Sequence, residues 1–343
     1  MTEMTFMQAV NNALDLAMEK DDTVLLLGED IYGGSGVEHL EEKNEDAWGG
    51  SFGVLKGLGP KYGADRVIDT PISEHGYMSA AVGMAATGLR PVPELMFNDF
   101  IGWCLDAILG QATKLRYMFG GKAKVPITVR TAHGAGVSAS AQHSGSYYGI
   151  LGNIPGLNIV VPATPHDAKG LLLACIEDDN PCFFFEDKTL YGSKGEVPDD
   201  YYTIEIGKAK VVEEGEDLTI VTIGKMLFVA QEAAEELKEA GISTEIIDLR
   251  TVAPWDQETV LESARKTGRV IVVDEDNPHN NTATDIASVI MREAFDYLDG
   301  PVLTVCAPNT PVPFARNLEA LYIPDTNKVI TEGAELIDDL RQH

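Results

Sequence analysis

Short apolar runs of strand length alternate with helical patterns along almost the whole chain, and this alternation limits the fold more than any other feature of the sequence. The run Thr23–Leu27 is the first of these strands, and it follows a helical segment that opens with the capping-box pair Thr5 and Gln8. Strands that alternate with helices pair in parallel and need a layer of helices on each face of their sheet. The sequence therefore predicts an α/β fold built on mainly parallel, doubly wound sheets.

The length of the chain indicates two domains. A chain of 343 residues is too long for one ordinary hydrophobic core. Residues 187–202, which include Gly, Ser, Lys and the run Pro-Asp-Asp, have the composition of an interdomain linker, and the alternation restarts after them. We therefore expect a first parallel-sheet domain at 1–186, a linker at 187–202, and a smaller second α/β domain at 203–343.

Apolar periodicity, capping residues and turn residues place the individual elements. The expected strands lie at 23–27, 66–68, 91–96, 126–130, 157–161, 182–186, 209–212, 218–223, 244–248, 270–274 and 302–306. The expected helices lie at 5–21, 54–58, 77–86, 99–118, 164–178, 226–240, 256–266 and 282–297.

The chain is strongly acidic, which excludes two classes of partner. It has 26 basic and 54 acidic residues and a net charge of -28. Such a surface repels nucleic acid and anionic membranes, and it attracts a basic protein module. The acidic runs Glu41–Asp46 and Glu213–Asp217 are expected to be solvated surface.

The sequence lacks the features of an exported or membrane protein. It has no run of 18 apolar residues, and its first residues do not resemble a signal peptide, so we expect a cytoplasmic protein. The cysteines have no CxxC spacing and are expected to be buried thiols, which fits a reducing compartment. These cysteines are Cys104, Cys175, Cys182 and Cys306.

The stretch Asp69–Gly76 places a carboxylate and an imidazole side by side where a strand ends and a helix begins. Pro71 ends the strand, and a helix of small residues follows. Glu74 at this junction is either an anion that the helix dipole stabilises or a group directed at a ligand. We expect the neighbouring His75 to be structural.

Further polar groups follow other strands of the first domain. Ligands of open α/β sheets bind at the carboxyl ends of the strands. Glu29 follows the strand at 23–27, and residues 131–145 follow the strand at 126–130. This second segment is almost without bulky side chains, which lets its backbone approach a ligand closely, and it contains His133 and His143. By itself each histidine would be a hydrogen-bonded structural residue.

Several classes of active site are excluded by missing motifs. The sequence has no P-loop, no GxSxG elbow and no HExxH, so we expect no self-contained nucleotide site, no serine hydrolase and no catalytic metal bound by this chain's own side chains. The remaining acids and bases provide no electron sink. A borrowed cofactor or substrate must therefore supply the chemistry.

Several motifs resemble those of one family, in the right order and over essentially the whole chain. These runs are Val67–Glu74, Gly88–Glu94, Ala141–Ser144, Asp178–Pro181 and Asp248–Asp256. They resemble the β subunit of the thiamine-diphosphate-dependent first component of 2-oxo acid dehydrogenase complexes. Within that family, Met96–Gly102, Tyr117–Lys122 and Ala307–Phe314 are most similar to the acetoin dehydrogenase branch.

The resemblance implies a pyrimidine-type thiamine-diphosphate-binding domain followed by a transketolase C-terminal-like domain. It also implies an assembly of two α and two β chains with the cofactor at the α/β interface. Glu74 matches the glutamate that bonds the aminopyrimidine ring, and Phe100, otherwise a core residue, matches the aromatic residue that stacks on it. His143 matches a histidine near the reacting centre that shuttles a proton or orients the lipoyl group. Glu29 matches a carboxylate near the cofactor.

The resemblance also implies where the metal ions bind. Thiamine enzymes hold Mg²⁺ and the diphosphate with a Gly-Asp-Gly motif and a later Asn, and the pair Asn280 and Asn281 has no such motif before it. The α partner is therefore expected to hold the Mg²⁺. A structural K⁺ site of oxygen ligands would fall on Ile127, Cys175, Ile176, Asp178 and Asn180.

The expected reaction is cleavage of acetoin to acetaldehyde, with transfer of the acetyl unit to lipoamide on a dihydrolipoamide acyltransferase component. The same machinery could instead act on pyruvate or on branched-chain 2-oxo acids. In an alternative hypothesis, this chain is a non-catalytic scaffolding subunit. It docks the acyltransferase core, and the α subunit carries out all catalysis.

Overall fold

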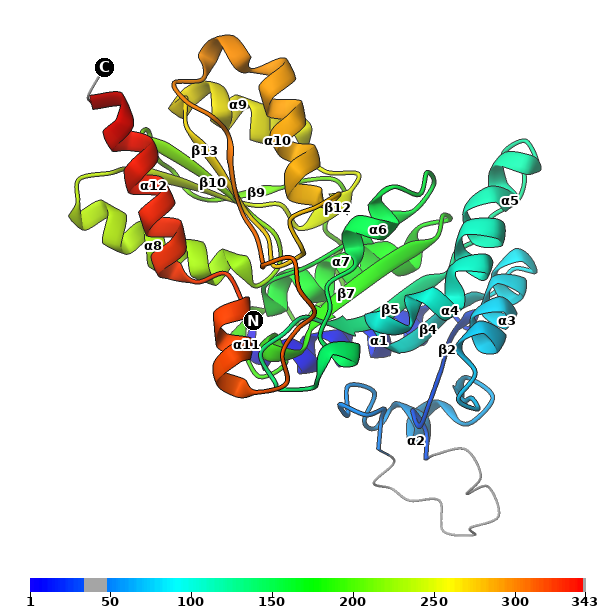
Figure 1. Ribbon diagram of the computed structural model, residues 1–343. Coiled ribbons are helices and arrows are strands. Elements are labelled where there is room, and N and C mark those ends of the chain that lie inside the picture. The colour runs from blue at the N-terminus through cyan, green and yellow to red at the C-terminus, as the bar shows by residue number, and fades with distance from the viewer. Residues whose placement is uncertain (34–47, 342–343) are drawn as a thin grey trace.

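The computed structural model describes residues 1–33 and 48–341 (Figure 1). The acidic run Glu41–Asp46, which we expected on the surface, lies outside the described residues. No helix in the described part of the chain is long and apolar enough to cross a membrane. Cys104, Cys175, Cys182 and Cys306 are buried and free, as the sequence predicted.

The first sheet is parallel except at one edge, as the alternation of elements predicted. Its spatial order is β12, β6, β7, β5, β4, β2, β3, and β12 pairs with β6 in the antiparallel direction. The strand bounds in that order are Thr251–Ala253, Asn158–Val160, Cys182–Asp187, Thr128–His133, Arg90–Phe97, Val24–Gly28 and Val67–Asp69.

Helices cover both faces of this sheet. Helix α1 (Phe6–Lys20) and helix α7 (Pro165–Glu177) pack on one face, against side chains such as Leu26 and Phe184. The other face packs on α3 (Glu74–Ala86), α4 (Ile101–Leu105) and α6 (Tyr148–Gly152). The capping box at Thr5 and Gln8 is present as predicted, since the Gln8 amide donates to Thr5 Oγ1 at 3.1 Å and the Thr5 amide donates to Gln8 Oε1 at 2.8 Å.

The second sheet is also mainly parallel. Its order is β14 (Leu303–Val305), β13 (Val270–Val273), β10 (Leu218–Thr222), β11 (Thr244–Asp248) and β9 (Lys210–Glu213), with β9 antiparallel to β11. Helices α8 (Met226–Glu239) and α12 (Thr326–Arg341) cover one face, whereas α9 (Gln257–Thr267) and α10 (Thr282–Glu293) cover the other (Figure 1).

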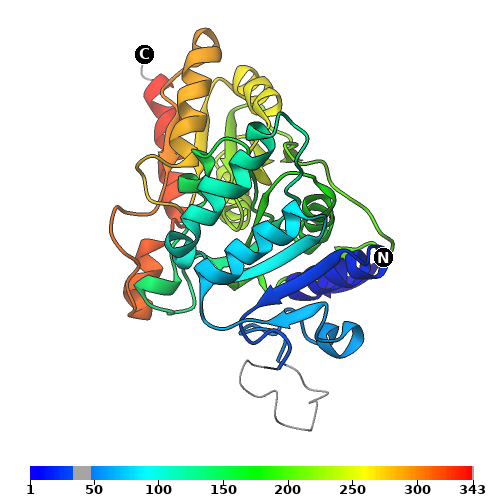
Figure 2. The same ribbon diagram turned by 90° about the vertical axis from the view of Figure 1, so that its right-hand side faces the viewer.

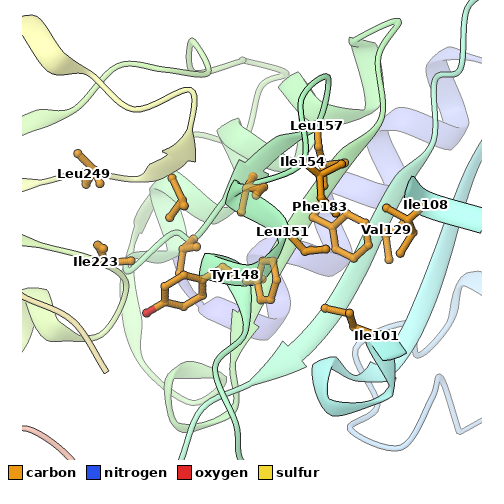
Figure 3. Close-up of a cluster of buried hydrophobic side chains, with 14 of the residues drawn as sticks. Ile101, Ile108, Val129, Tyr148, Leu151, Ile154, Leu157, Phe183, Ile223 and Leu249 are labelled. Atoms are coloured by element: carbon orange, nitrogen blue, oxygen red, sulfur yellow. The ribbon is translucent and has the colours of Figure 1, made fainter. Parts of the chain in front are cut away.

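The two halves share one hydrophobic core. Figure 3 shows Tyr148 and Leu151 of α6 between Val129 of the first sheet and Ile223 and Leu249 of the second half. Strand β12 belongs to the second half of the sequence and yet pairs with β6 of the first sheet. The two termini lie on different halves of the molecule (Figures 1 and 2). The shared core fixes the halves relative to each other.

Some elements differ from those expected. Residues 187–202, expected as a linker, contain β8 (Lys194–Val197), which pairs antiparallel with β1 (Thr2–Thr5). The domain limits 1–186 and 203–343 stay a proposal. Helix α2 spans Leu58–Tyr62, so the helix expected at 54–58 was wrong in position. Glycines in left-handed backbone, such as Gly53 and Gly57, break any helical pattern before it.

The helix expected at 99–118 is divided into several segments. A 3₁₀ turn (Asn98–Phe100) leads into α4, a π-helical segment (Asp106–Ala112) follows, and α5 (Thr113–Met118) ends the run. The sequence also did not predict α11 (Arg316–Tyr322) and α12, which follow the last strand. Helix α12 has an amphipathic sequence pattern, with Val329, Leu336 and Ile337 on its buried side, and this signal was overlooked.

Candidate active site

Glu74 is the first residue of α3, directly after the strand-to-helix junction that the sequence singled out. Its side chain is partly buried, and a carboxylate in a first helical turn is stabilised by the helix dipole. The turn before it is ordered by Asp69, whose carboxylate accepts hydrogen bonds from the amides of Tyr32 (2.7 Å) and Gly33 (2.9 Å). The neighbouring His75 is exposed.

Glu29 follows the carboxyl end of β2 and is buried, with 6% of its surface exposed. Burial and then the neighbouring charge of Glu74 raise the pKa of the Glu29 carboxyl to about 7. Its Oε1 atom has no hydrogen-bond partner among the described residues. A buried carboxyl oxygen without a partner is costly, so this arrangement fits a site that a polar ligand completes.

The two glutamates lie close enough for the charge of Glu74 to act on the Glu29 carboxyl. A carboxyl with a raised pKa beside a second carboxyl is the arrangement that enzymes use to hold and pass a proton near neutral pH. The sequence analysis expected both residues near the cofactor, and the structure brings Glu29 and Glu74 together.

Phe100 and His143, the other two predicted site residues, also come together. Their ring centroids lie 5.7 Å apart with an edge-to-face inclination of 82°. Phe97, which the sequence analysis did not single out, lies closer to the imidazole, with centroids 4.4 Å apart. His143 Nδ1 is 3.2 Å from the carbonyl oxygen of Ala139. The imidazole is therefore held by two aromatic rings and a backbone contact.

The turn that carries Phe100 also binds the loop that carries His143. Asn98 Nδ2 donates to the Gly145 carbonyl at 2.8 Å, and Asn98 Oδ1 accepts from the Tyr147 amide at 2.9 Å. The Gly145 amide donates to Asp99 Oδ1 at 3.2 Å. Asn98 and Asp99 have positioning roles that only the contact between the turn after β4 and the loop after β5 reveals.

The order of the strands places the two glutamates and the Phe100–His143 pair along one edge of the first sheet. Strands β5, β4, β2 and β3 are neighbours in that order, and their pairings are parallel. His143, Phe100, Glu29 and Glu74 follow the carboxyl ends of these strands in the same order. This edge is where ligands bind in such sheets.

A buried ion network under this edge was missed by sequence reasoning. Arg130 Nη1 donates to Glu94 Oε2 and Arg130 Nη2 donates to Glu186 Oε2, both at 2.9 Å. The Tyr191 hydroxyl donates to the same Glu186 oxygen at 3.0 Å. The sequence did contain a signal for this network, because Glu94, Arg130 and Glu186 each lie in a run that was predicted to be a buried strand. The charge of Glu94 contributes to the raised pKa of Glu29.

A second buried network joins the two halves. His133 Nδ1 lies 3.1 Å from Ser146 Oγ and 3.2 Å from Glu275 Oε1. Lys225 Nζ lies 3.1 Å from Asp187 Oδ2 and 2.5 Å from Glu275 Oε2. His133, Asp187 and Glu275 offer ligand atoms that lie within 4.8 Å of one another, and the Lys225 ammonium contacts two of these residues, Asp187 and Glu275. The network is therefore an interdomain ion cluster.

Lys188 connects this cluster to the aromatic group. Its Nζ donates to the Gly134 carbonyl at 2.6 Å and lies 5.7 Å from the centroid of the Phe97 ring. Burial lowers the pKa of the Lys188 ammonium to about 8. This residue lay inside the expected linker, so sequence reasoning assigned it no role.

The oxygens expected to bind K⁺ already accept hydrogen bonds from the protein. Arg90 Nη1 donates to the carbonyls of Ile176 and Asp178, each at 3.0 Å. The Ile127 carbonyl accepts from the Cys182 amide at 2.8 Å. The remaining contacts are from Thr128 Oγ1 to the Cys175 carbonyl at 3.0 Å and from Arg116 Nη1 to Asn180 Oδ1 at 3.1 Å. A K⁺ site here stays a prediction.

Family models match both halves of the chain. Residues 2–194 match the transketolase pyrimidine binding domain, and residues 207–329 match the transketolase C-terminal domain. These matches agree with the two sheets described above.

Curated relatives match over nearly the whole chain. The β subunit of the acetoin:2,6-dichlorophenolindophenol oxidoreductase of Bacillus subtilis is 54% identical, with 96% of each chain covered. The β subunit of the same name from Cupriavidus necator is 50% identical, with 94% of each chain covered. The pyruvate dehydrogenase E1 β subunit of Rhizobium meliloti is 42% identical over 96% of this chain and 69% of its own length.

A solved structure has the same fold. A split-gene transketolase, described as an inactive β4 tetramer, has a TM-score of 0.76 and is 22% identical. The match covers 98% of this chain and 98% of that chain. At that identity the likeness concerns the fold alone. The family matches and the curated relatives together show that this chain belongs to the family of two-domain, transketolase-like β subunits that includes the acetoin and pyruvate dehydrogenase β subunits.

Proposed function

We propose that this chain is the β subunit of a thiamine-diphosphate-dependent acetoin dehydrogenase component that works with an α subunit. The acetoin-oxidising relatives are 54% and 50% identical, whereas the pyruvate dehydrogenase relative is 42% identical. The observation that carries a catalytic role for this chain is the pair of Glu29 and Glu74, in which the buried Oε1 atom of Glu29 has no hydrogen-bond partner within the described residues.

The proposed reaction cleaves the carbon–carbon bond of acetoin. One two-carbon half leaves as acetaldehyde. The other half is oxidised to the acetyl level while a lipoyl disulfide is reduced, and the product is an acetyl thioester on the resulting dithiol. Thiamine diphosphate, when bound, supplies the electron sink that the side chains of this chain lack.

Each predicted residue has a proposed role at the carboxyl edge of the first sheet. Glu74 would hold the pyrimidine ring of the cofactor through a carboxylate hydrogen bond, and Phe100 would stack on that ring. Glu29, whose pKa is raised to about 7, would hold or release a proton beside Glu74. His143 would move a proton or orient the lipoyl group at the reacting centre.

The metal ions have separate proposed sites. This chain has no Gly-Asp-Gly motif, so we assign Mg²⁺ and the diphosphate to the α partner. The proposed K⁺ ligands are Ile127, Cys175, Ile176, Asp178 and Asn180. Since Arg90 already donates to two of these carbonyls, K⁺ binding needs the second lone pair of those oxygens or a shift of the guanidinium.

The proposed assembly contains two α and two β chains. Both acetoin-oxidising relatives are named as β subunits, which supports a subunit of another kind as partner. The lipoyl group is proposed to come from a dihydrolipoamide acyltransferase component. A net charge of -28 suits a basic docking module on that component.

The test is reconstitution with an α chain that carries the Gly-Asp-Gly motif. Acetoin and pyruvate are supplied separately with thiamine diphosphate, Mg²⁺ and a lipoyl domain, and acetaldehyde and carbon dioxide are measured. Acetaldehyde release from acetoin supports the proposal. Carbon dioxide release from pyruvate at a higher kcat/KM would favour the 2-oxo acid alternative. Full activity of a complex with Glu74→Gln would favour a scaffolding role.

A further inference from the structure

Residues 134–143 form a loop that runs from the end of β5 through the 3₁₀ turn Ala141–His143, and this loop has few bulky side chains. It passes through left-handed backbone at Gly136, Ser138 and Ser140, with φ angles of +123°, +54° and +69°. Serine seldom adopts such angles, and small side chains make few packing contacts of their own. Groups outside the loop must therefore fix its path.

A carboxylate from the second half of the sequence binds the middle of this loop. Glu319 Oε1 accepts hydrogen bonds from the Gly136 amide at 2.8 Å and from the Ser138 amide at 3.1 Å. Its Oε2 accepts from the same Ser138 amide at 2.9 Å and from Ser138 Oγ at 3.1 Å. Glu319 is only 2% exposed. It lies on α11, which Figure 1 shows, in orange, beside the first half of the molecule.

Among the described residues, the other hydrogen bonds from side chains outside the loop lie at its start. Lys188 Nζ donates to the Gly134 carbonyl at 2.6 Å, and Lys225 Nζ donates to the Ala135 carbonyl at 2.8 Å. Glu319 is the side chain from outside the loop that binds residues 136–140 within the described structure. It therefore acts on the part of the loop nearest to the turn.

A short path connects Glu319 to the imidazole. Ser138, which Glu319 binds through three contacts, is followed by Ala139, whose carbonyl lies 3.2 Å from His143 Nδ1. The His143 amide in turn donates to the Ser140 carbonyl at 3.2 Å. A shift of Ser138 therefore displaces both backbone groups that orient His143.

We propose that Glu319 is a positioning residue for His143, acting across the two halves of the chain by fixing the loop at Gly136 and Ser138. The proposal rests on the proposed function of His143 in acetyl transfer. Glu319 itself touches no substrate in this scheme. This anchoring uses both carboxylate oxygens of Glu319 as acceptors. In Glu319→Gln, the side-chain amide has one acceptor oxygen, and its N–H donors would face the N–H of Ser138.

The experiment compares Glu319→Gln with Glu335→Gln, an exposed carboxylate on α12, in the complex with α and thiamine diphosphate. Two activities are measured, acetyl transfer to a lipoyl domain and acetoin-dependent reduction of an artificial dye. In Glu319→Gln we expect transfer to fall about tenfold to 100-fold, since small displacements of a reacting group have effects of that size. Dye reduction should stay within about twofold, because it does not need the lipoyl-directed step.

A double variant tests whether Glu319 acts through His143. If it does, His143→Ala with Glu319→Gln transfers acetyl no more slowly than His143→Ala alone. Additive losses, an unchanged transfer rate in Glu319→Gln, or equal losses of both activities would each overturn the proposal.

Hydrogen exchange separates this proposal from the proposed function. In the same complex, the amides of Gly136 and Ser138 should exchange faster in Glu319→Gln than in the wild type or in Glu335→Gln. If the wild-type complex shows neither activity, the proposed function fails, and the exchange result alone decides the anchoring role of Glu319. Unchanged exchange at both amides would overturn it.

Discussion

The imidazole ring of His143 lies against the phenyl ring of Phe97, with centroids 4.4 Å apart and ring planes inclined by 34°. His143 follows the end of β5, whereas Phe97 is the last residue of the neighbouring strand β4. The His143 imidazole, to which we assign a role in the chemistry, therefore packs against a residue of β4, the strand next to β5.

Replacing Glu74 by Gln should abolish most thiamine-dependent turnover of the α/β complex. The amide keeps the size of the side chain but cannot stabilise a positive charge or take a proton, and such proton transfer contributes about 10² to 10⁴ in rate. The measurement is acetoin-dependent dye reduction. Glu258→Gln, in the first turn of α9, is the matched control for loss of a helix-start acid. Turnover equal to that of the wild type would refute the assigned role.

His143→Ala should separate two activities of the complex. Acetyl transfer to a lipoyl domain should fall by about 10² or more, since a positioned acid or base is lost. Cofactor binding, measured by calorimetry, should weaken only slightly. His75→Ala removes an exposed imidazole as the control. Transfer that is unaffected by His143→Ala would contradict the assignment.

Glu29→Gln should change how the stability of the purified chain depends on pH. The folded protein raises the pKa of this carboxyl from 4.5 to about 7, so its contribution to stability is present below pH 4.5 and is lost as the pH rises through about 7. Gln cannot ionise. Relative to the wild type, the variant should therefore gain about 1 kcal/mol in free energy of unfolding between pH 5 and pH 8, after allowance for solvent screening.

Denaturant unfolding at several pH values measures this gain. Glu19→Gln, at an exposed position on α1, should give no pH-dependent difference. A gain for Glu29→Gln at pH 5 that vanishes at pH 8 would have the wrong sign and would contradict the burial of a charged group at this site.

Arg130→Met should strongly destabilise the fold. It leaves the carboxyl groups of Glu94 and Glu186 buried without their cation, and breaking such a buried pair costs about 3–5 kcal/mol. Lys194→Met breaks an exposed pair with Glu3 and should cost only about 0–1 kcal/mol. Urea unfolding of both variants checks the difference. Similar losses for the two would show that the buried network contributes little.

The isolated chain should bind thiamine diphosphate poorly. The proposed site here provides contacts to the pyrimidine half, while the diphosphate and Mg²⁺ are assigned to α. Calorimetric titration should show weak or no binding without α and tight binding with it. Stoichiometric, tight binding to the isolated chain would rule out the interface model.

Periodic apolar runs predicted the strands of the two sheets except β12 (Thr251–Ala253), because the burial of each predicted strand depends mainly on its own residues. Strand β8, with the sequence Lys194-Gly-Glu-Val197, carries no such pattern. It forms because the exposed edge of β1 offers backbone partners, which is a tertiary effect. Helix α2 was misplaced since left-handed glycines delay its start, and their φ angles are not written in the sequence.

Part of the candidate site was predictable, because some of its residues are marked by their local sequence. Glu74 and Glu29 stand at strand ends, which marks them locally. Phe97, Lys188 and Glu319 act through contacts between segments far apart in sequence, for example the 181 residues that separate Ser138 from Glu319. No local pattern encodes such contacts. Family motifs supplied His143 and Phe100, which periodicity alone would have left as ordinary structural residues.

Strand β12 has a consequence for protein engineering. Because Thr251–Ala253 completes an edge of the first sheet, a chimera that exchanges the carboxyl-terminal half with that of a relative also replaces a strand of the amino-terminal sheet. It would also replace Ile223 and Leu249 in the shared core. The two halves are therefore not interchangeable modules. We expect functional chimeras only where the donor supplies an edge strand matched to Asn158–Val160.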